Sequence, residues 1–151
     1  MSDNDSLYRE LKDDLQAVAE PLFEFACEQV KKRGAFLPMG AKLSAEGETG
    51  LVAAAAEEDL TTSEVVLPLL VQGLNQYATS AEALALCEWV KIDVEGGKRR
   101  DAVKVHAQHR RGLCVAFYLP ATKSLFRGWQ FGDMMVTPAA SFIEAWRSSD
   151  A

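Results

Sequence analysis

The N-terminal part of the chain carries apolar residues at every third or fourth position from about Ser6 to Lys32, a spacing that predicts an amphipathic helix. Pro21 lies inside this stretch. Because proline has no backbone N–H and its ring crowds the carbonyl of Ala17, we expect a kinked helix or two helices that share one buried face. The cationic residues 31–33 followed by Gly34 are typical of a helix end with a left-handed glycine cap.

The next pattern predicts a β-hairpin and a second helix. Two apolar runs, residues 35–43 and 51–56, flank a polar, glycine-rich turn. Pro38 and Gly40 weaken a central ladder, so we expect the first strand at a sheet edge or at a bulge. Thr61, as N-cap, and Glu64 fit a capping box that begins a helix ending near Ala78. Its buried face would hold Val66, Leu70, Leu74 and Tyr77, with Pro68 as a kink and Gly73 as a weak point.

Three further runs, residues 83–94, 102–109 and 113–119, predict an antiparallel meander. Residues 110–112 fit a three-residue hairpin loop with Gly112 at positive φ, which sets His109 opposite Leu113. One face of the sheet then holds Val103, Val105, Ala107, Val115, Phe117 and Leu119. The other face holds Lys104, His106, Gln108, Cys114, Ala116 and Tyr118.

The tail predicts one more strand at 129–136 and a final helix. Thr137 would be the N-cap and Pro138 the first helical residue, with Phe142, Ile143 and Trp146 buried. The whole pattern predicts a single α+β domain over residues 1–151. We expect a mostly antiparallel sheet of five or six strands with helices packed on one face.

Composition places the chain among globular proteins: 151 residues, 48% hydrophobic, with a net charge of −6. No apolar run approaches the ~20 residues of a membrane span, and the N-terminus is acidic and polar, unlike a secretory signal. Cys27, Cys87 and Cys114 are widely spaced among apolar neighbours, typical of buried, reduced thiols. We therefore expect a cytoplasmic protein without a membrane partner.

The charge is distributed unevenly. Residues 98–127 contain eight Lys/Arg and one Asp, a net charge of +7, so the other residues sum to −13. Arg99, Arg100, Arg110 and Arg111 lie in successive hairpin loops and are a candidate charged contact surface. Three interpretations stay open: compensation by neighbouring carboxylates, contact with an acidic protein or a second copy, and nucleic-acid binding. We do not expect nucleic acid, because aromatic side chains are not interleaved with these charges.

Two groups of residues carry a resemblance to a known family. The first is Phe23-Glu24-Phe25-Ala26 with the stretch from Gly34 to Gly40. The second is Asp101-Ala102-Val103, His109, Gly112 and Tyr118-Leu119-Pro120. Over roughly residues 20–122 the chain resembles a family of small bacterial cytosolic α+β proteins with no assigned activity, and departs from it at Gln108 and Ala121. The resemblance implies a bacterial source.

Motifs of catalysis are missing from the sequence. It contains no Walker A loop, no G-x-G-x-x-G and no G-x-S-x-G elbow, and His106 and His109 would lie on opposite faces of a strand. We expect no catalytic residue, metal ligand or cofactor. The one group that could form a small polar site is His106, Tyr118 and Lys104, on one face of the meander.

These observations favour a non-enzymatic protein that acts through protein–protein interaction or self-association. The partners we expect are a second copy of the chain, giving a homodimer, or an acidic protein. The alternative hypothesis is a small-ligand-binding protein or enzyme that uses the sheet face around His106, Tyr118 and Lys104.

Overall fold

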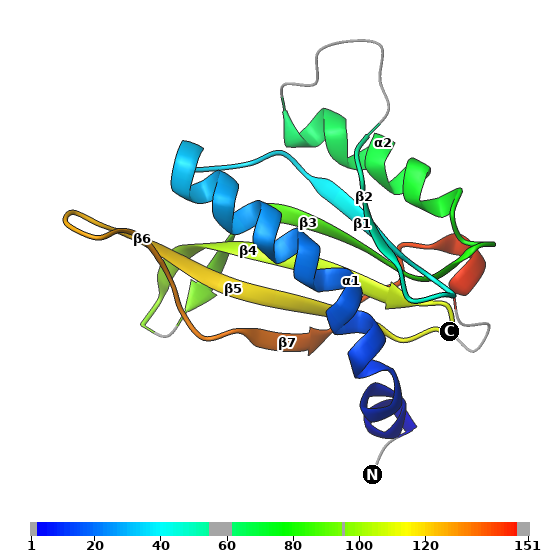
Figure 1. The fold of residues 1–151 in the computed structure, drawn as a ribbon. Helices are drawn as coiled ribbons and strands as arrows, with labels where there is room; N and C mark the ends of the chain where they lie inside the picture. Colours follow the sequence, from blue (N-terminus) through cyan, green and yellow to red (C-terminus); the bar gives the residue numbers. More distant parts are fainter. Residues whose placement is uncertain (1–2, 55–61, 95, 148–151) are drawn as a thin grey trace.

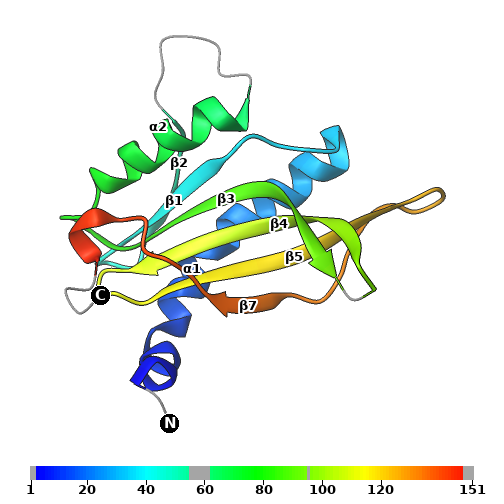
Figure 2. The ribbon, with the colours of Figure 1, turned by 180° about the vertical axis from the view of Figure 1, so that it is seen from behind.

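The computed structural model describes residues 3–54, 62–94 and 96–147. A seven-stranded antiparallel sheet lies between two helices (Figures 1 and 2). The strand order is β2-β1-β3-β4-β5-β6, and β7 also pairs with β5. The elements are α1 (Asp3–Arg33), β1 (Met39–Ser44), β2 (Thr49–Val52), α2 (Ser63–Asn75), β3 (Ala81–Val94), β4 (Lys98–His109), β5 (Cys114–Ser124), β6 (Gly128–Phe131), β7 (Met135–Pro138) and a 3-10 turn (Glu144–Trp146).

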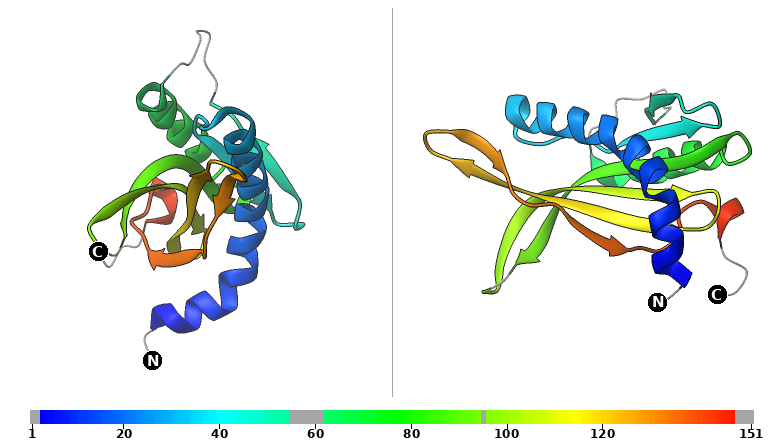
Figure 3. Two further views of the ribbon diagram at one scale, coloured as in Figure 1. Left: turned by 90° about the vertical axis from the view of Figure 1, so that its left-hand side faces the viewer. Right: turned by 60° about the horizontal axis from the view of Figure 1, so that its bottom comes forward.

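The predicted α+β class and antiparallel sheet are confirmed, with two differences in detail. The sheet has seven strands because the tail adds both β6 and β7 along one edge of β5. The helices lie on opposite faces, not on one, as Figure 3 shows edge-on. The reason lies in β3, which is apolar on both sides: Ala83, Ala85 and Cys87 pack in the core with α1, whereas Leu84 and Leu86 pack with α2.

The first helix runs unbroken through Pro21 and buries the predicted stripe. It ends as expected, with Gly34 at φ 79° and its N–H donated to the Val30 carbonyl at 2.8 Å. In the described part of the chain, no helix is both long and apolar enough to cross a bilayer.

The first hairpin is confirmed, but its first strand is not at an edge. β1 lies between β2 and β3, and Pro38 is tolerated because it precedes the strand. The register of β1 with β3 is regular at Gly40 and shifts only between Leu43 and Ser44, so the bulge expected at Pro38 and Gly40 is not there. Gly40 lies beneath α2, where a Cβ would meet the Leu74 side chain at 3.0 Å. Glycine here allows the helix and the sheet to approach closely.

The second helix begins at Ser63 and ends at Asn75, earlier than predicted. Thr62 is its N-cap, without a side-chain capping hydrogen bond, and Thr61 lies outside the described residues. The predicted face is buried at Val66, Leu70 and Leu74.

The meander has the predicted register. Gly112 adopts φ 99°, and the His109 N–H bonds the Leu113 carbonyl at 2.8 Å. Val105 pairs with Phe117 in the α1 core, and Lys104 pairs with Tyr118 on the opposite face.

The predicted C-terminal helix is wrong. Thr137 and Pro138 belong to strand β7, and up to residue 147 only a 3-10 turn follows. Ile143 and Trp146 are nevertheless buried, as expected for the apolar positions. The segment is extended because side chains of other elements satisfy its backbone, as described below.

Candidate functional site

The His106 side chain is held by the C-terminal segment. Its Nε2 lies 2.7 Å from the Ala140 carbonyl and 3.1 Å from Cys114 Sγ, and its ring packs on Phe142 with centroids 4.5 Å apart. Because a carbonyl oxygen only accepts, Nε2 carries a hydrogen and donates it to Ala140. The Cys114 thiol lies 3.2 Å from the same oxygen and also donates to it.

This arrangement does not make a nucleophile. Burial raises the pKa of Cys114 to about 12, outweighing the Lys104 charge that lowers it. Burial also lowers the pKa of His106, with Lys104 adding to the effect and the Ala140 hydrogen bond opposing it. A Cys–His pair needs a thiolate and a histidine nitrogen free to take the thiol proton. Here Nε2 is already a donor, so the pair serves to hold the C-terminal segment.

Lys104 and Tyr118 lie opposite each other on β4 and β5, two residues along β4 from His106. The Lys104 ammonium sits 5.8 Å from the centre of the Tyr118 ring, a cation–π contact. The described residues form one surface cavity of 830 Å³ and another of 620 Å³. None of the three predicted site residues lines either of them. The ligand site around them stays a prediction.

The second histidine joins three elements. His109, 1% exposed, places Nε2 2.9 Å from Asp14 Oδ2 on α1 and 3.7 Å from Glu82 Oε1 on β3. Its Nδ1 accepts the backbone N–H of Arg111 at 3.2 Å, so the ring hydrogen is on Nε2 and is donated to Asp14.

Three potential ligands therefore meet at one point: Asp14, Glu82 and His109. A metal bound at Nε2 would require the hydrogen on Nδ1, where a second-shell acceptor normally holds it. Nδ1 instead faces the N–H donor of Arg111. Arg110 also forms an ion pair with Glu82, with Arg110 Nη1 3.7 Å from Glu82 Oε2. The cluster fits an ion-paired clamp between α1 and the sheet better than a metal site.

The four predicted contact arginines do not form one surface. Arg99 lies 3.4 Å from Asp93, Arg110 pairs with Glu82, and Arg111 pairs with Glu10. Arg99 and Arg100 lie at the start of β4, whereas Arg110 and Arg111 follow its other end. These contacts favour the compensation interpretation of the basic segment.

Two functional polar residues were missed by sequence reasoning. Gln108 Oε1 accepts the backbone N–H groups of Phe142 and Ile143, at 3.0 and 3.1 Å. Asn75 donates to the Phe142 carbonyl and accepts the Glu144 N–H. The one sequence signal was Gln108 itself, a polar residue in a strand with apolar neighbours. It could have indicated a buried hydrogen-bond partner but not which segment supplies it.

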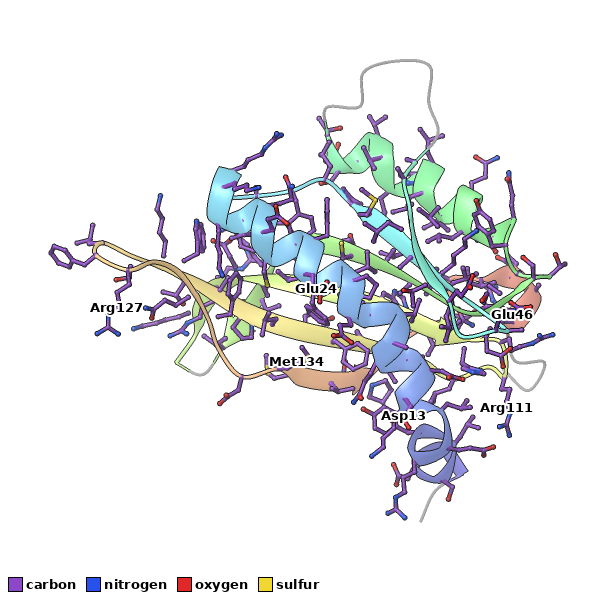
Figure 4. All side chains as sticks on the ribbon, viewed as in Figure 1. Asp13, Glu24, Glu46, Arg111, Arg127 and Met134 are labelled. Carbon is purple, nitrogen blue, oxygen red and sulfur yellow. The ribbon has the colours of Figure 1, made fainter. Side chains whose placement is uncertain are left out.

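Strand β7, at the edge of the sheet, is exposed along its whole length and begins with apolar residues. Met134, Met135 and Val136 are 45%, 43% and 44% exposed. Within the described residues β7 pairs with β5 alone. Figure 4 labels Met134 at the start of this edge. The 830 Å³ cavity adjoins it, formed by the first turns of α1, the start of β5 and residues 136–141, and including Arg111 and Arg147.

Comparison with protein-family models, with curated proteins and with solved structures finds no match to this chain. The family resemblance and the bacterial source therefore stay predictions.

Proposed function

We propose that this protein is a non-enzymatic interaction protein that acts as a homodimer joined through β7. The observation that carries the proposal is the exposed edge at β7, where Met134, just before the strand, and Met135 and Val136 within it are consecutive, apolar and exposed. Exposed apolar edges of this kind are templates for pairing with another chain. The engaged state of His106 and Cys114 supports a protein that does not work by covalent chemistry.

The backbone of β7 indicates how two copies would pair. The Ala139 N–H bonds the Cys114 carbonyl at 3.1 Å, so residues 135, 137 and 139 direct their backbone groups toward β5. Val136 directs its N–H and carbonyl to the open side. A two-fold axis at Val136 lets the two Val136 residues exchange both hydrogen bonds.

The same axis accommodates Pro138. It sets Met134 opposite Pro138 of the second copy, where the proline carbonyl can accept the Met134 N–H but the proline has no N–H for the Met134 carbonyl. Asp133 then lies beside Ala139 of the second copy. Ala139 lines the cavity that contains Arg111 and Arg147, which pair with Glu10 and Glu144. Since both arginines are already paired, the open backbone groups of Val136, rather than charge, favour a second copy as the occupant.

Light scattering during size exclusion tests the proposal. We expect a dimer for the wild-type protein and a monomer for Val136→Lys, which places a charge at the axis. Leu51→Lys is the matched control, since Leu51 is 50% exposed on β2, the strand at the opposite edge. A wild-type monomer at high concentration would contradict the proposal, and so would equal dissociation of both folded variants.

A further inference from the structure

We propose that the end of the molecule formed by the β5–β6 hairpin and the last turn of α1 attaches the protein to an anionic phospholipid bilayer surface. This inference is independent of the homodimer. The sequence led us to expect no membrane partner because it holds no span, but attachment to the surface requires none.

The hairpin tip is apolar and fully presented to solvent. Leu125 is 96% exposed and Phe126 is 97% exposed, in the turn that links β5 to β6. Figures 1 and 3 show this hairpin extending beyond the body of the molecule. Two large apolar side chains at a protruding tip gain free energy by entering the boundary between headgroups and acyl chains.

Cations surround the base of this tip. Lys123 and Arg127 flank it in the sequence, and the 620 Å³ cavity brings them together with Lys31, Lys32 and Arg33 of α1. Figure 4 shows Arg127 on the hairpin, at the opposite end of the molecule from Arg111. Among the described residues only Lys32 of these five is in an ion pair, with Glu28 at 2.6 Å. Lys31 lies 5.9 Å from the centre of the Phe131 ring, and Arg33, Lys123 and Arg127 are available to anionic headgroups.

The order of these groups favours a bilayer over an acidic protein. The apolar residues are foremost and the cations lie behind them, as acyl chains and anionic headgroups would require. Trp129 lies in the same cavity, partly buried against Trp89 with ring centroids 5.6 Å apart, and indole rings favour the interface. The remaining chain is acidic overall, so an anionic bilayer would repel it. This repulsion would orient the cationic end toward the bilayer.

Co-sedimentation with vesicles tests the inference. We expect the wild-type protein to sediment with phosphatidylcholine vesicles containing phosphatidylserine, and not with phosphatidylcholine alone. Lys123→Ser/Arg127→Ser should weaken binding roughly 30-fold, since each cation contributes about a fivefold gain near such a surface. Leu125→Ser/Phe126→Ser should also weaken it. Circular dichroism would confirm that each variant is folded.

Arg9→Ser/Lys12→Ser is the matched control, because it removes the same charge from exposed positions in the first turns of α1, at the opposite end of that helix from residues 31–33. We expect this variant to bind as the wild type does. Equal loss in the control, no vesicle binding by the wild type, or unchanged binding after removal of the apolar tip would each overturn the inference. Binding to polyglutamate without vesicle binding would point to an acidic protein instead.

Discussion

His109 Nε2 donates a hydrogen bond to Asp14 Oδ2 at 2.9 Å, and this contact ties the first helix to the end of the meander. The two residues are far apart in the sequence, and the histidine is buried while the aspartate is partly exposed. The contact therefore closes α1 over the core face of the sheet.

Removal of the acceptor should weaken the fold. Asp14→Ala leaves the buried Nε2–H of His109 without its bond to Asp14, so we expect the free energy of unfolding in urea to fall by about 1–3 kcal/mol. Asp13→Ala, one residue away and exposed, should change it little (Figure 4 labels Asp13). Equal stabilities of the two variants would show that the clamp contributes nothing.

Two glycines should respond to alanine in opposite directions. Gly40→Ala puts a Cβ 3.0 Å from Leu74 and 3.1 Å from Leu70, and overpacking of this kind costs about 1–3 kcal/mol. Gly73→Ala meets nothing within 4 Å inside α2 and should raise stability by about 0.5–1 kcal/mol. Thermal unfolding of both variants checks the close approach of α2 to β1. A stabilised Gly40→Ala variant would contradict it.

The three thiols should differ in reactivity. Burial raises the pKa of Cys87 and of Cys114 to about 12, whereas Cys27 is only partly buried. We expect iodoacetamide to modify Cys27 first in the native protein, and the other two only after unfolding. Peptide mass spectrometry after timed alkylation measures this. Rapid native modification of Cys114 would mean that the C-terminal segment does not cover it.

His106 should make the protein less stable in mild acid. Its pKa in the folded state lies below the ordinary value of 6.5, chiefly through burial. The unfolded chain therefore takes up the proton first, and stability falls as the pH drops below about 6.5. The acid-induced loss should be smaller in His106→Gln, compared by urea unfolding at neutral and mildly acidic pH. Identical losses in the two proteins would contradict this assignment.

The local patterns were sufficient to predict the meander but not the tail. The three-residue loop with Gly112 fixed the register by itself, so the pairing of Val105 with Phe117 could be predicted. Phe142, Ile143 and Trp146 have helical spacing, yet the backbone N–H groups of Phe142 and Ile143 are donated to Gln108 and that of Glu144 to Asn75. Such tertiary partners override a helical pattern, and no local signal reports them.

The partners of the charged side chains also could not be predicted from local sequence, because the fold brings them together. The basic segment was visible in the sequence, but the carboxylates that pair with Arg110 and Arg111 lie on β3 and α1. The cations of residues 31–33 join Lys123 and Arg127 only because the sheet carries β6 to the end of α1. Both the ion pairs of these arginines and the cation cluster join residues far apart in the sequence, so no local pattern predicts them.

Disulfide trapping at Val136 tests whether two copies pair through β7. Paired residues of antiparallel strands have Cα atoms about 5.5 Å apart, within the range of a disulfide bond. In a Cys27→Ser background, Val136→Cys should form a disulfide-linked dimer readily on mild oxidation, and Leu51→Cys should not. A Val136→Cys protein that stays monomeric, or cross-links no faster than Leu51→Cys, would contradict the two-fold axis at this residue.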